Sequence, residues 1–201
     1  METQIKYFSN QELRNFFKQL EADRLNSITD YAVKCAVRNE ALFKVMYYCA
    51  LRATETTMLE VDSFNALKNE IYCKRIKGGL NNTLEIIDMD VLRSLKRHLS
   101  FNSPKKYLFE NMRDDKSLSR KTLDKIFKET CSQIQRSISK RKWHCHTLRH
   151  TRAINLAEKG LDLKELQYWL GHSEISNTLI YFSFTSKQCA ALYKKLKKGA
   201  S

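Results

Sequence analysis

Residues that break helices are scarce in this chain, and their scarcity limits the folds open to it. Among 201 residues there is one proline, Pro104, and there are five glycines, Gly78, Gly79, Gly160, Gly171 and Gly199. Proline lacks the amide proton that a helix needs, and glycine lowers helix stability through its flexibility. The long stretches without either residue predict a mainly helical protein, and the length suits a single domain.

Capping residues and hydrophobic spacing predict where the helices lie. Ser9 and Glu12 form a capping-box pattern that opens a first helix, ending near residue 22. Gly160 and Gly171 each follow a helical pattern, as glycines that stop helices do. The further helices are expected over about 30–51, a short stretch from 54, 90–99, 117–138 (capped at Ser119), 146–159, 163–170, a short stretch ending near 181, and 185–198.

One stretch differs from the helical pattern, because strand-forming residues gather at 61–63, 70–77 and 83–88. Gly78-Gly79 lies between the last two and indicates a hairpin turn. The expected fold class is therefore α+β, mainly α with a small antiparallel β-sheet. We expect one domain over 1–201, made of an N-terminal helix (1–27), a core (28–182) and a basic tail helix (183–201).

The chain is strongly basic, with 36 Lys and Arg against 22 Asp and Glu and a net charge of +14. These excess positive charges repel one another, and the usual reason for a protein to carry them is a polyanionic partner. No acidic residue occurs from Cys131 to Ala157. A charge run is often only a solvated face, but a purely basic one of this length favours phosphate contact. The candidate DNA contacts in it are Lys140, Arg141, Lys142 and Arg152.

Other features narrow the compartment and the cofactors. No apolar run approaches the roughly 18 residues of a membrane-spanning helix, and the first residues lack a signal pattern. The six cysteines are scattered without a C-x-x-C pair, which favours a reduced, cytoplasmic protein. His144-Cys145-His146 has no second ligand pair at a suitable spacing, so we expect no metal.

Four short motifs lie far apart in the chain. They are Cys49-Ala50-Leu51-Arg52-Ala53-Thr54-Glu55, Arg75-Ile76-Lys77-Gly78-Gly79, His146-Thr147-Leu148-Arg149, and Leu170-Gly171-His172-Ser173 with Tyr181 nine residues after His172. His146 and Arg149 share one face of a helix, and a cation pair there suits a phosphate. Each motif alone has an ordinary structural explanation. In this order and at these distances, over about residues 28–182, they resemble the tyrosine recombinase (phage integrase) family, and the short chain resembles the fimbrial phase-switch recombinases.

The resemblance implies a role for each residue that matches a motif. Arg52 and Arg149 would hold the non-bridging oxygens of a scissile phosphate, and Tyr181 would be the nucleophile. His146 and His172 would hydrogen-bond the phosphate, with His146 favoured as the base. Lys77 would be the general acid, with Lys74 and Arg75 as alternatives. Glu55 would either support these residues or simply belong to the first turn of a helix.

This chemistry needs no cofactor. Attack on a phosphodiester builds negative charge, which preorganised cations stabilise. Arginine suits that task because its planar fork binds phosphate through two hydrogen bonds. Tyrosine titrates near pH 10, so it needs a base or nearby cations to react.

The resemblance therefore implies a site-specific DNA recombinase or integrase of a mobile genetic element, acting through a 3′-phosphotyrosyl intermediate. Its partners would be double-stranded DNA carrying recombination sites, further copies of the chain in a tetramer, and accessory DNA-bending factors, at the nucleoid. The tail would dock on a neighbouring copy or on its own chain. Two alternatives remain open: a non-catalytic DNA-binding protein with a helix-turn-helix over 163–182, and a DNA-relaxing enzyme resembling type IB topoisomerases.

Overall fold

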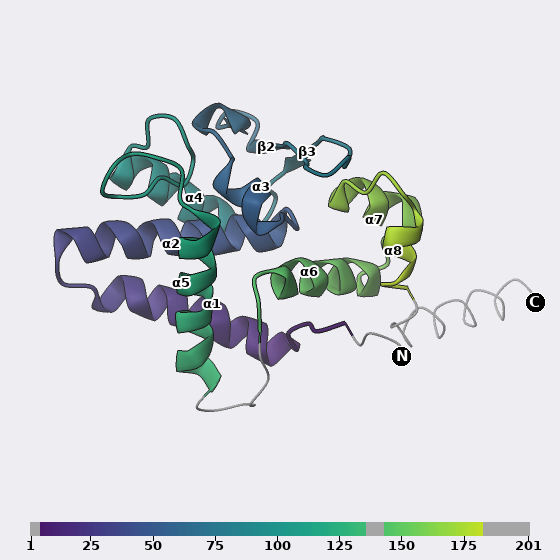
Figure 1. The fold of residues 1–201 in the computed structure, drawn as a ribbon, viewed down its shortest axis with the longest axis horizontal. Coiled ribbons are helices and arrows are strands. Elements are labelled where there is room, and N and C mark those ends of the chain that lie inside the picture. Colours follow the sequence, from purple (N-terminus) through teal and green to yellow (C-terminus); the bar gives the residue numbers. More distant parts are fainter. Residues whose placement is uncertain (1–4, 136–142, 183–201) are drawn as a thin grey trace, which may run out of the picture.

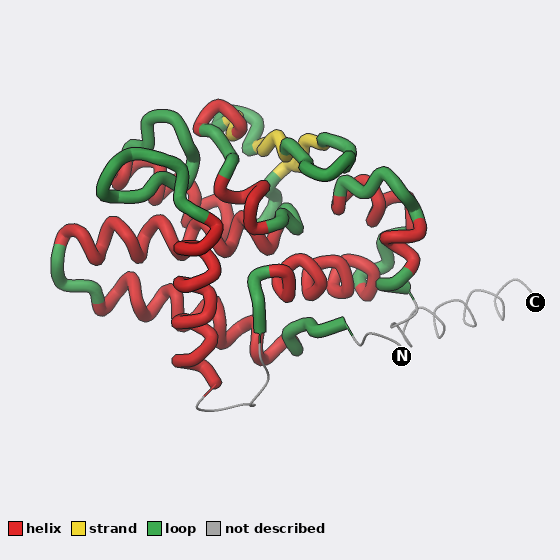
Figure 2. The backbone as a smooth tube through the Cα atoms, viewed as in Figure 1, coloured by secondary structure: helices red, strands yellow, loops and turns green. Residues whose placement is uncertain are grey.

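A computed structural model describes residues 5–135 and 143–182, and helices account for most of them (Figure 2). The expected class, mainly α with a small antiparallel sheet, is confirmed. The helices are α1 (Asn10–Asn26), α2 (Asp30–Tyr48), α3 (Ala53–Thr57), α4 (Met89–Asn102), α5 (Arg120–Gln135), α6 (His146–Glu158), α7 (Leu163–Leu170) and α8 (Ser176–Leu179). The strands are β1 (Phe64–Asn65), β2 (Glu70–Cys73) and β3 (Asn82–Glu85).

The ends of the first two helices show how local chemistry sets their lengths. Ser9 and Glu12 form the predicted capping box, with the Ser9 amide donating to Glu12 Oε2 at 2.8 Å. The helix α1 continues to Asn26, beyond the expected end near residue 22. The helix α2 stops at Tyr48 instead of 51, because Ala50 has a φ of 50°, in the left-handed region that ends a helix.

The sheet is smaller than the sequence predicts. The expected strand at Val61–Ser63 is wrong, because these residues form a 3₁₀ turn in which the Ser63 amide donates to Glu60 O at 3.0 Å. The observed order is β1-β2-β3, all antiparallel, with buried Ile71 opposite buried Leu84. Positive φ angles at Lys77 and Gly78 turn the chain between β2 and β3.

The helix α2 is the centre of the molecule, in contact with α1, α3, α4 and α6 (Figure 1). Four phenylalanines, Phe8, Phe16, Phe43 and Phe127, pack together in tilted and edge-on contacts in the main core between α1, α2 and α5. A smaller core joins α6 and α7 and includes Tyr181. This arrangement brings the end of α2, the β2–β3 turn, α6 and the end of α7 to one side of the molecule.

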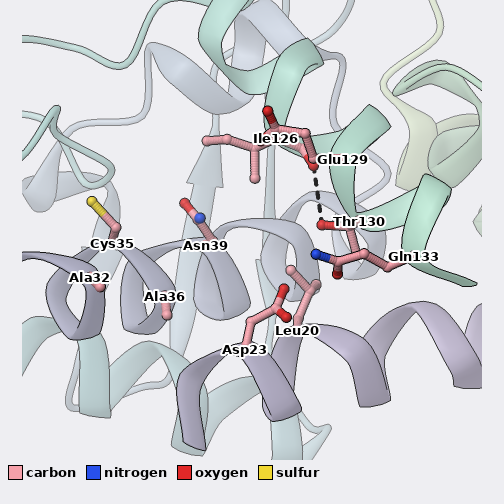
Figure 3. A pocket seen from close by; sticks show the side chains of 10 residues that line it. All are labelled: Leu20, Asp23, Ala32, Cys35, Ala36, Asn39, Ile126, Glu129, Thr130 and Gln133. Carbon is pink, nitrogen blue, oxygen red and sulfur yellow. Dashed lines mark hydrogen bonds between the residues drawn. The ribbon is translucent and has the colours of Figure 1, made fainter. Parts of the chain in front are cut away.

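Away from that side, a cavity of about 240 Å³ lies between α1, α2 and α5 (Figure 3). Its walls include Leu20, Cys35, Asn39 and Ile126, and Thr130 Oγ1 donates to the Ile126 carbonyl at 3.1 Å. None of the candidate catalytic residues lines it. Over the described part of the chain, no helix is long and apolar enough to cross a membrane.

Candidate active site

The carboxylate of Glu55 is the meeting point of three arginines from separate segments. Arg52 Nη1 lies 2.6 Å from Glu55 Oε1, and Glu55 Oε2 lies 3.4 Å from Arg75 Nη1 and 3.8 Å from Arg149 Nη1. The side chain of Glu55 is fully buried. Since one negative charge faces three positive charges, the cluster keeps an excess of positive charge.

The position of Arg52 follows from the turn between α2 and α3. Cys49, Ala50 and Leu51 are fully buried there, which anchors the turn in the core. Arg52 then caps α3, with its amide donating to Glu55 Oε2 at 2.9 Å. A quarter of the Arg52 side chain remains exposed, so a ligand can reach this guanidinium.

Arg149 lies beneath Arg52, on the first turn of α6, and is 1% exposed. Its guanidinium donates to the carbonyl of Ala50 and, at 2.8 Å, to that of Leu170. These bonds use two of its five N–H donors. Burial, together with the charge of Arg52, lowers the pKa of Arg149 to about 9, which leaves it charged at neutral pH.

Burial alone would raise the pKa of Glu55. Hydrogen bonds from the amide and guanidinium of Arg52, and the charges of Arg149 and Arg75, outweigh burial and hold that pKa below its ordinary value. The carboxylate is therefore ionised at neutral pH, and its negative charge attracts all three guanidinium groups.

A cleft of about 430 Å³ opens over Arg52. Lys77 and His146, both exposed, line the same cleft as Arg52. The other charged or titratable residues of the cleft are Arg120, Asp124, Lys128, His144 and Cys145. The sequence did not single out Arg120 or Lys128, because α5 looks like any amphipathic helix with a charged face.

The three candidates for the general acid lie in different surroundings. Lys77 lines the cleft with Arg52, whereas Lys74 lines a neighbouring cavity with Tyr72. Arg75 is buried, with a side chain that is 0% exposed. The cleft therefore favours Lys77 among the three.

His172 follows directly after Gly171, which ends α7 with a φ of 64°. His172 is 7% exposed, and its Nδ1 lies 2.9 Å from Thr178 Oγ1. Burial first, and then the charges of Arg149, Arg52 and Arg75, lower the pKa of His172 to about 3. The ring is neutral at physiological pH.

Tyr181 is 2% exposed, and its hydroxyl lies 2.9 Å from His150 Nδ1. Burial raises the pKa of Tyr181, while the charges of Arg149 and Arg52 act in the opposite direction. Burial outweighs the two charges, so the pKa of Tyr181 lies above its ordinary value and the hydroxyl is protonated at neutral pH.

His150 is a further residue of this site that none of the sequence motifs indicates as functional. Its ring also packs edge-on against His146, with the ring centroids 4.6 Å apart. Burial first, and then neighbouring His146, lower the pKa of His150 to about 3, so the ring is neutral. A neutral imidazole accepts a proton from the tyrosine hydroxyl when Nδ1 carries no hydrogen. The spacing of four residues from His146 could have identified it, since i and i+4 share a helix face.

The predicted DNA contacts are only partly described. A DNA contact would need Arg152 on the surface, but this residue is only 7% exposed. Its Nε donates to the Tyr48 carbonyl at 3.1 Å. Its guanidinium also lies over the rings of Tyr47, Tyr48 and Trp169. Lys140, Arg141, Lys142 and the expected tail helix lie outside the described residues.

The family model of the phage integrase family matches residues 15–188 of this chain. The chain therefore belongs to the phage integrase family. A tyrosine recombinase of Thermosipho africanus is 29% identical over 160 residues, which is 80% of this chain and 54% of the relative. Tyrosine recombinase XerA of Pyrococcus furiosus is 27% identical over 173 residues, which is 85% of this chain and 58% of the relative. The chain thus spans less than two thirds of the length of these relatives.

Solved structures show the same fold. The crystal structure of XerA recombinase matches with a TM-score of 0.76 at 18% identity, over 97% of this chain and 65% of that one. The structure of XerH site-specific recombinase bound to a palindromic difH substrate, a post-cleavage complex, matches with a TM-score of 0.70 at 20% identity, over 96% of this chain and 54% of that one.

The substitution Glu55→Gln tests the role of the central carboxylate. It removes the one carboxylate that, within residues 5–135 and 143–182, pairs with these three guanidinium groups, so we expect the free energy of unfolding to fall by about 3–5 kcal/mol. Urea denaturation measures the change, and Glu60→Gln, at an exposed position, is the matched control. An equal stability of the two variants would contradict the role given to Glu55.

The low pKa of His172 predicts a pH dependence of stability. The unfolded state takes up a proton near pH 6.5 whereas the folded state does so only at about 3, so stability is full above pH 6.5 and falls as the pH drops through this window. From pH 7 to pH 5, wild type should lose about 2 kcal/mol more than His172→Asn. Urea denaturation at both pH values measures this difference, and parallel losses would show that the His172 ring is not held neutral.

Proposed function

We propose that the chain is a site-specific DNA recombinase that cuts and rejoins DNA through a covalent 3′-phosphotyrosyl intermediate. The observation that carries this proposal is the cluster of Arg52 and Arg149 on one buried carboxylate, together with a Tyr181 hydroxyl that lies 2.9 Å from His150 Nδ1. Excess positive charge next to a tyrosine hydroxyl suits attack on a phosphodiester.

In the first step, Tyr181 Oη attacks the phosphorus, and the bond from phosphorus to the 5′ oxygen breaks. Arg52 and Arg149 stabilise the charge on the non-bridging oxygens, with hydrogen bonds from His172. Lys77 gives its proton to the departing 5′ oxygen, so the products are a phosphotyrosine and a free 5′ hydroxyl. Attack by the 5′ hydroxyl of another strand reverses these bonds and needs no external energy source.

We assign His150 as the group that takes the proton of Tyr181, in place of His146. The support is the contact of 2.9 Å between His150 Nδ1 and the tyrosine hydroxyl. His146, exposed in the cleft, then serves as a hydrogen-bond donor to the phosphate. Tyr181 is 2% exposed. Before its hydroxyl can attack the phosphorus, either the segment around α8 must move or the DNA must enter the space next to Tyr181.

The DNA would lie along the cleft, where Lys77, Arg120 and Lys128 supply cations for the backbone. Lys140, Arg141 and Lys142 remain candidates for further contacts. The assembly that we propose on DNA is a tetramer, as in the family, with accessory DNA-bending factors as further partners and the nucleoid as the place of action.

Capture of a covalent adduct tests this function. The full chain is incubated with a pool of random duplexes, and adducts that survive boiling in detergent are recovered and sequenced. We expect adducts at a defined site, joined to the 3′ phosphate and leaving a free 5′ hydroxyl. Tyr181→Phe should form none, whereas Tyr31→Phe, which changes an exposed tyrosine elsewhere, should form them as wild type does.

The other outcomes separate the alternatives. Binding without any adduct would mean a non-catalytic DNA-binding protein. The helix α8, with four residues, is short for the second helix of a helix-turn-helix. Adducts and plasmid relaxation, without strand exchange between two duplexes that carry the recovered site, would mean a relaxing enzyme. Adducts formed by Tyr181→Phe would contradict the assignment of the nucleophile.

A further inference from the structure

We propose that Arg75 is a positioning residue: it fixes the β2–β3 turn, and with it Lys77, against Glu55 and the end of α7. The inference rests on the proposed function, because it concerns the lysine that protonates the leaving oxygen. Arg75 does not reach the cleft itself, since its side chain is fully buried.

The guanidinium of Arg75 contacts four different parts of the chain. Arg75 Nη1 lies 3.4 Å from Glu55 Oε2, and Arg75 Nε donates to Asn82 Oδ1 at 3.1 Å. Arg75 Nη2 donates to the carbonyls of Cys49, at 3.2 Å, and Trp169, at 2.8 Å. One side chain thus joins the end of α2, the helix α3, the strand β3 and the end of α7.

The turn also touches the end of α7 at the level of the backbone. The Leu80 amide donates to the Gly171 carbonyl at 3.1 Å. A Cβ on Gly171 would lie 2.6 Å from Arg75 Nε, and a Cβ on Gly79 would lie 2.8 Å from Gly171 O. Both glycines are therefore required for the approach, and the next residue after Gly171 is His172.

Lys77 depends on these contacts because it lies on the exposed part of the turn. The nearest anchors on its N-terminal side are the Arg75 side chain and the Ile76 amide, which donates to Glu55 Oε1 at 3.2 Å. On its C-terminal side the Leu80 amide is held by Gly171. Without Arg75, the turn would lose the contacts that this side chain makes with Glu55, Cys49 and Trp169. The Ile76 amide on Glu55 and the Asn82 side-chain amide on the Trp169 carbonyl would remain.

Arginine is the residue type that this position needs. Its five N–H donors spread in a plane and can serve several acceptors at once. Lysine would keep the charge, but its single ammonium group cannot reach four acceptors in this arrangement. Arg75→Lys should therefore cleave the DNA more slowly than wild type, but faster than a variant such as Arg75→Met that has no cation at this position.

A sulfur substitution in the DNA tests whether Arg75 acts through Lys77. The probe is the duplex recovered by adduct capture, made once with the normal 5′ oxygen and once with sulfur at that bridging position. A thiol titrates near pH 8.5, so a leaving thiolate needs no general acid. Sulfur should therefore rescue a defect in proton donation and not a defect in phosphate binding.

On the oxygen duplex, we expect Arg75→Met and Lys77→Met to slow cleavage on the order of 100-fold each, the usual contribution of a general acid. The sulfur duplex should recover most of that loss in both variants, whereas Arg52→Met should stay slow on both duplexes. Arg38→Met is the matched control, because Arg38 is also buried but bonds to the Glu110 carbonyl away from the site. Sulfur should change the cleavage rate of Arg38→Met no more than it changes that of wild type.

Two results would overturn the proposal: cleavage of the oxygen duplex by Arg75→Met at the wild-type rate, or equal slowing of this variant on both duplexes. Should Arg75→Met fail to fold, Arg75→Lys takes its place, with a smaller oxygen defect that sulfur again rescues.

Amide hydrogen exchange of the full chain without DNA provides a second readout. We expect the Gly79 and Leu80 amides, which donate to Ile76 O and Gly171 O, to exchange faster in Arg75→Met but not in Lys77→Met. Unchanged exchange would contradict a positioning role. A wild-type chain that cleaves no duplex contradicts the proposed function instead, and hydrogen exchange still decides whether Arg75 fixes the turn.

Discussion

The structure depends on one buried ion cluster, in which the carboxylate of Glu55 faces the guanidinium groups of Arg52, Arg75 and Arg149. Removing like charges from water is unfavourable unless each finds a partner. Glu55 supplies a single negative charge, so a second anion would balance the cluster further. A DNA phosphate has the charge and the acceptor geometry for this place, which connects the electrostatics of the fold to the proposed chemistry.

The fold class and some of the helix ends could be predicted, because they depend on local rules. The capping box at Ser9 and the helix stops at Gly160 and Gly171 are set by a few neighbouring residues. The sequence was misleading at Val61–Ser63, where strand-forming residues adopt a 3₁₀ turn. Tertiary contacts outweigh the β-propensity of these residues. One such contact is the hydrogen bond that the Val61 amide donates to the distant Lys106 carbonyl at 2.9 Å.

The sequence motifs indicated candidate site residues but not the contacts that these residues make. The motifs located Arg52, Arg149, His172 and Tyr181, whereas the sequence offered no way to see that Arg152 lies among aromatic rings. A cation in a basic run looks the same whether it faces solvent or packs on a ring. The same limit applies to Arg75, whose partners are far away in the chain and become neighbours only in the folded protein.

Tyr181 is buried, whereas a quarter of the Arg52 side chain is exposed. We propose that one phosphate joins both arginines and the tyrosine without breaking up the cluster on Glu55. A crystal structure of the covalent adduct measures this directly. We expect a bond from Tyr181 Oη to phosphorus, with the guanidinium groups of Arg52 and Arg149 on the non-bridging oxygens of the phosphate and both still beside Glu55. A phosphate bound to neither arginine would contradict it.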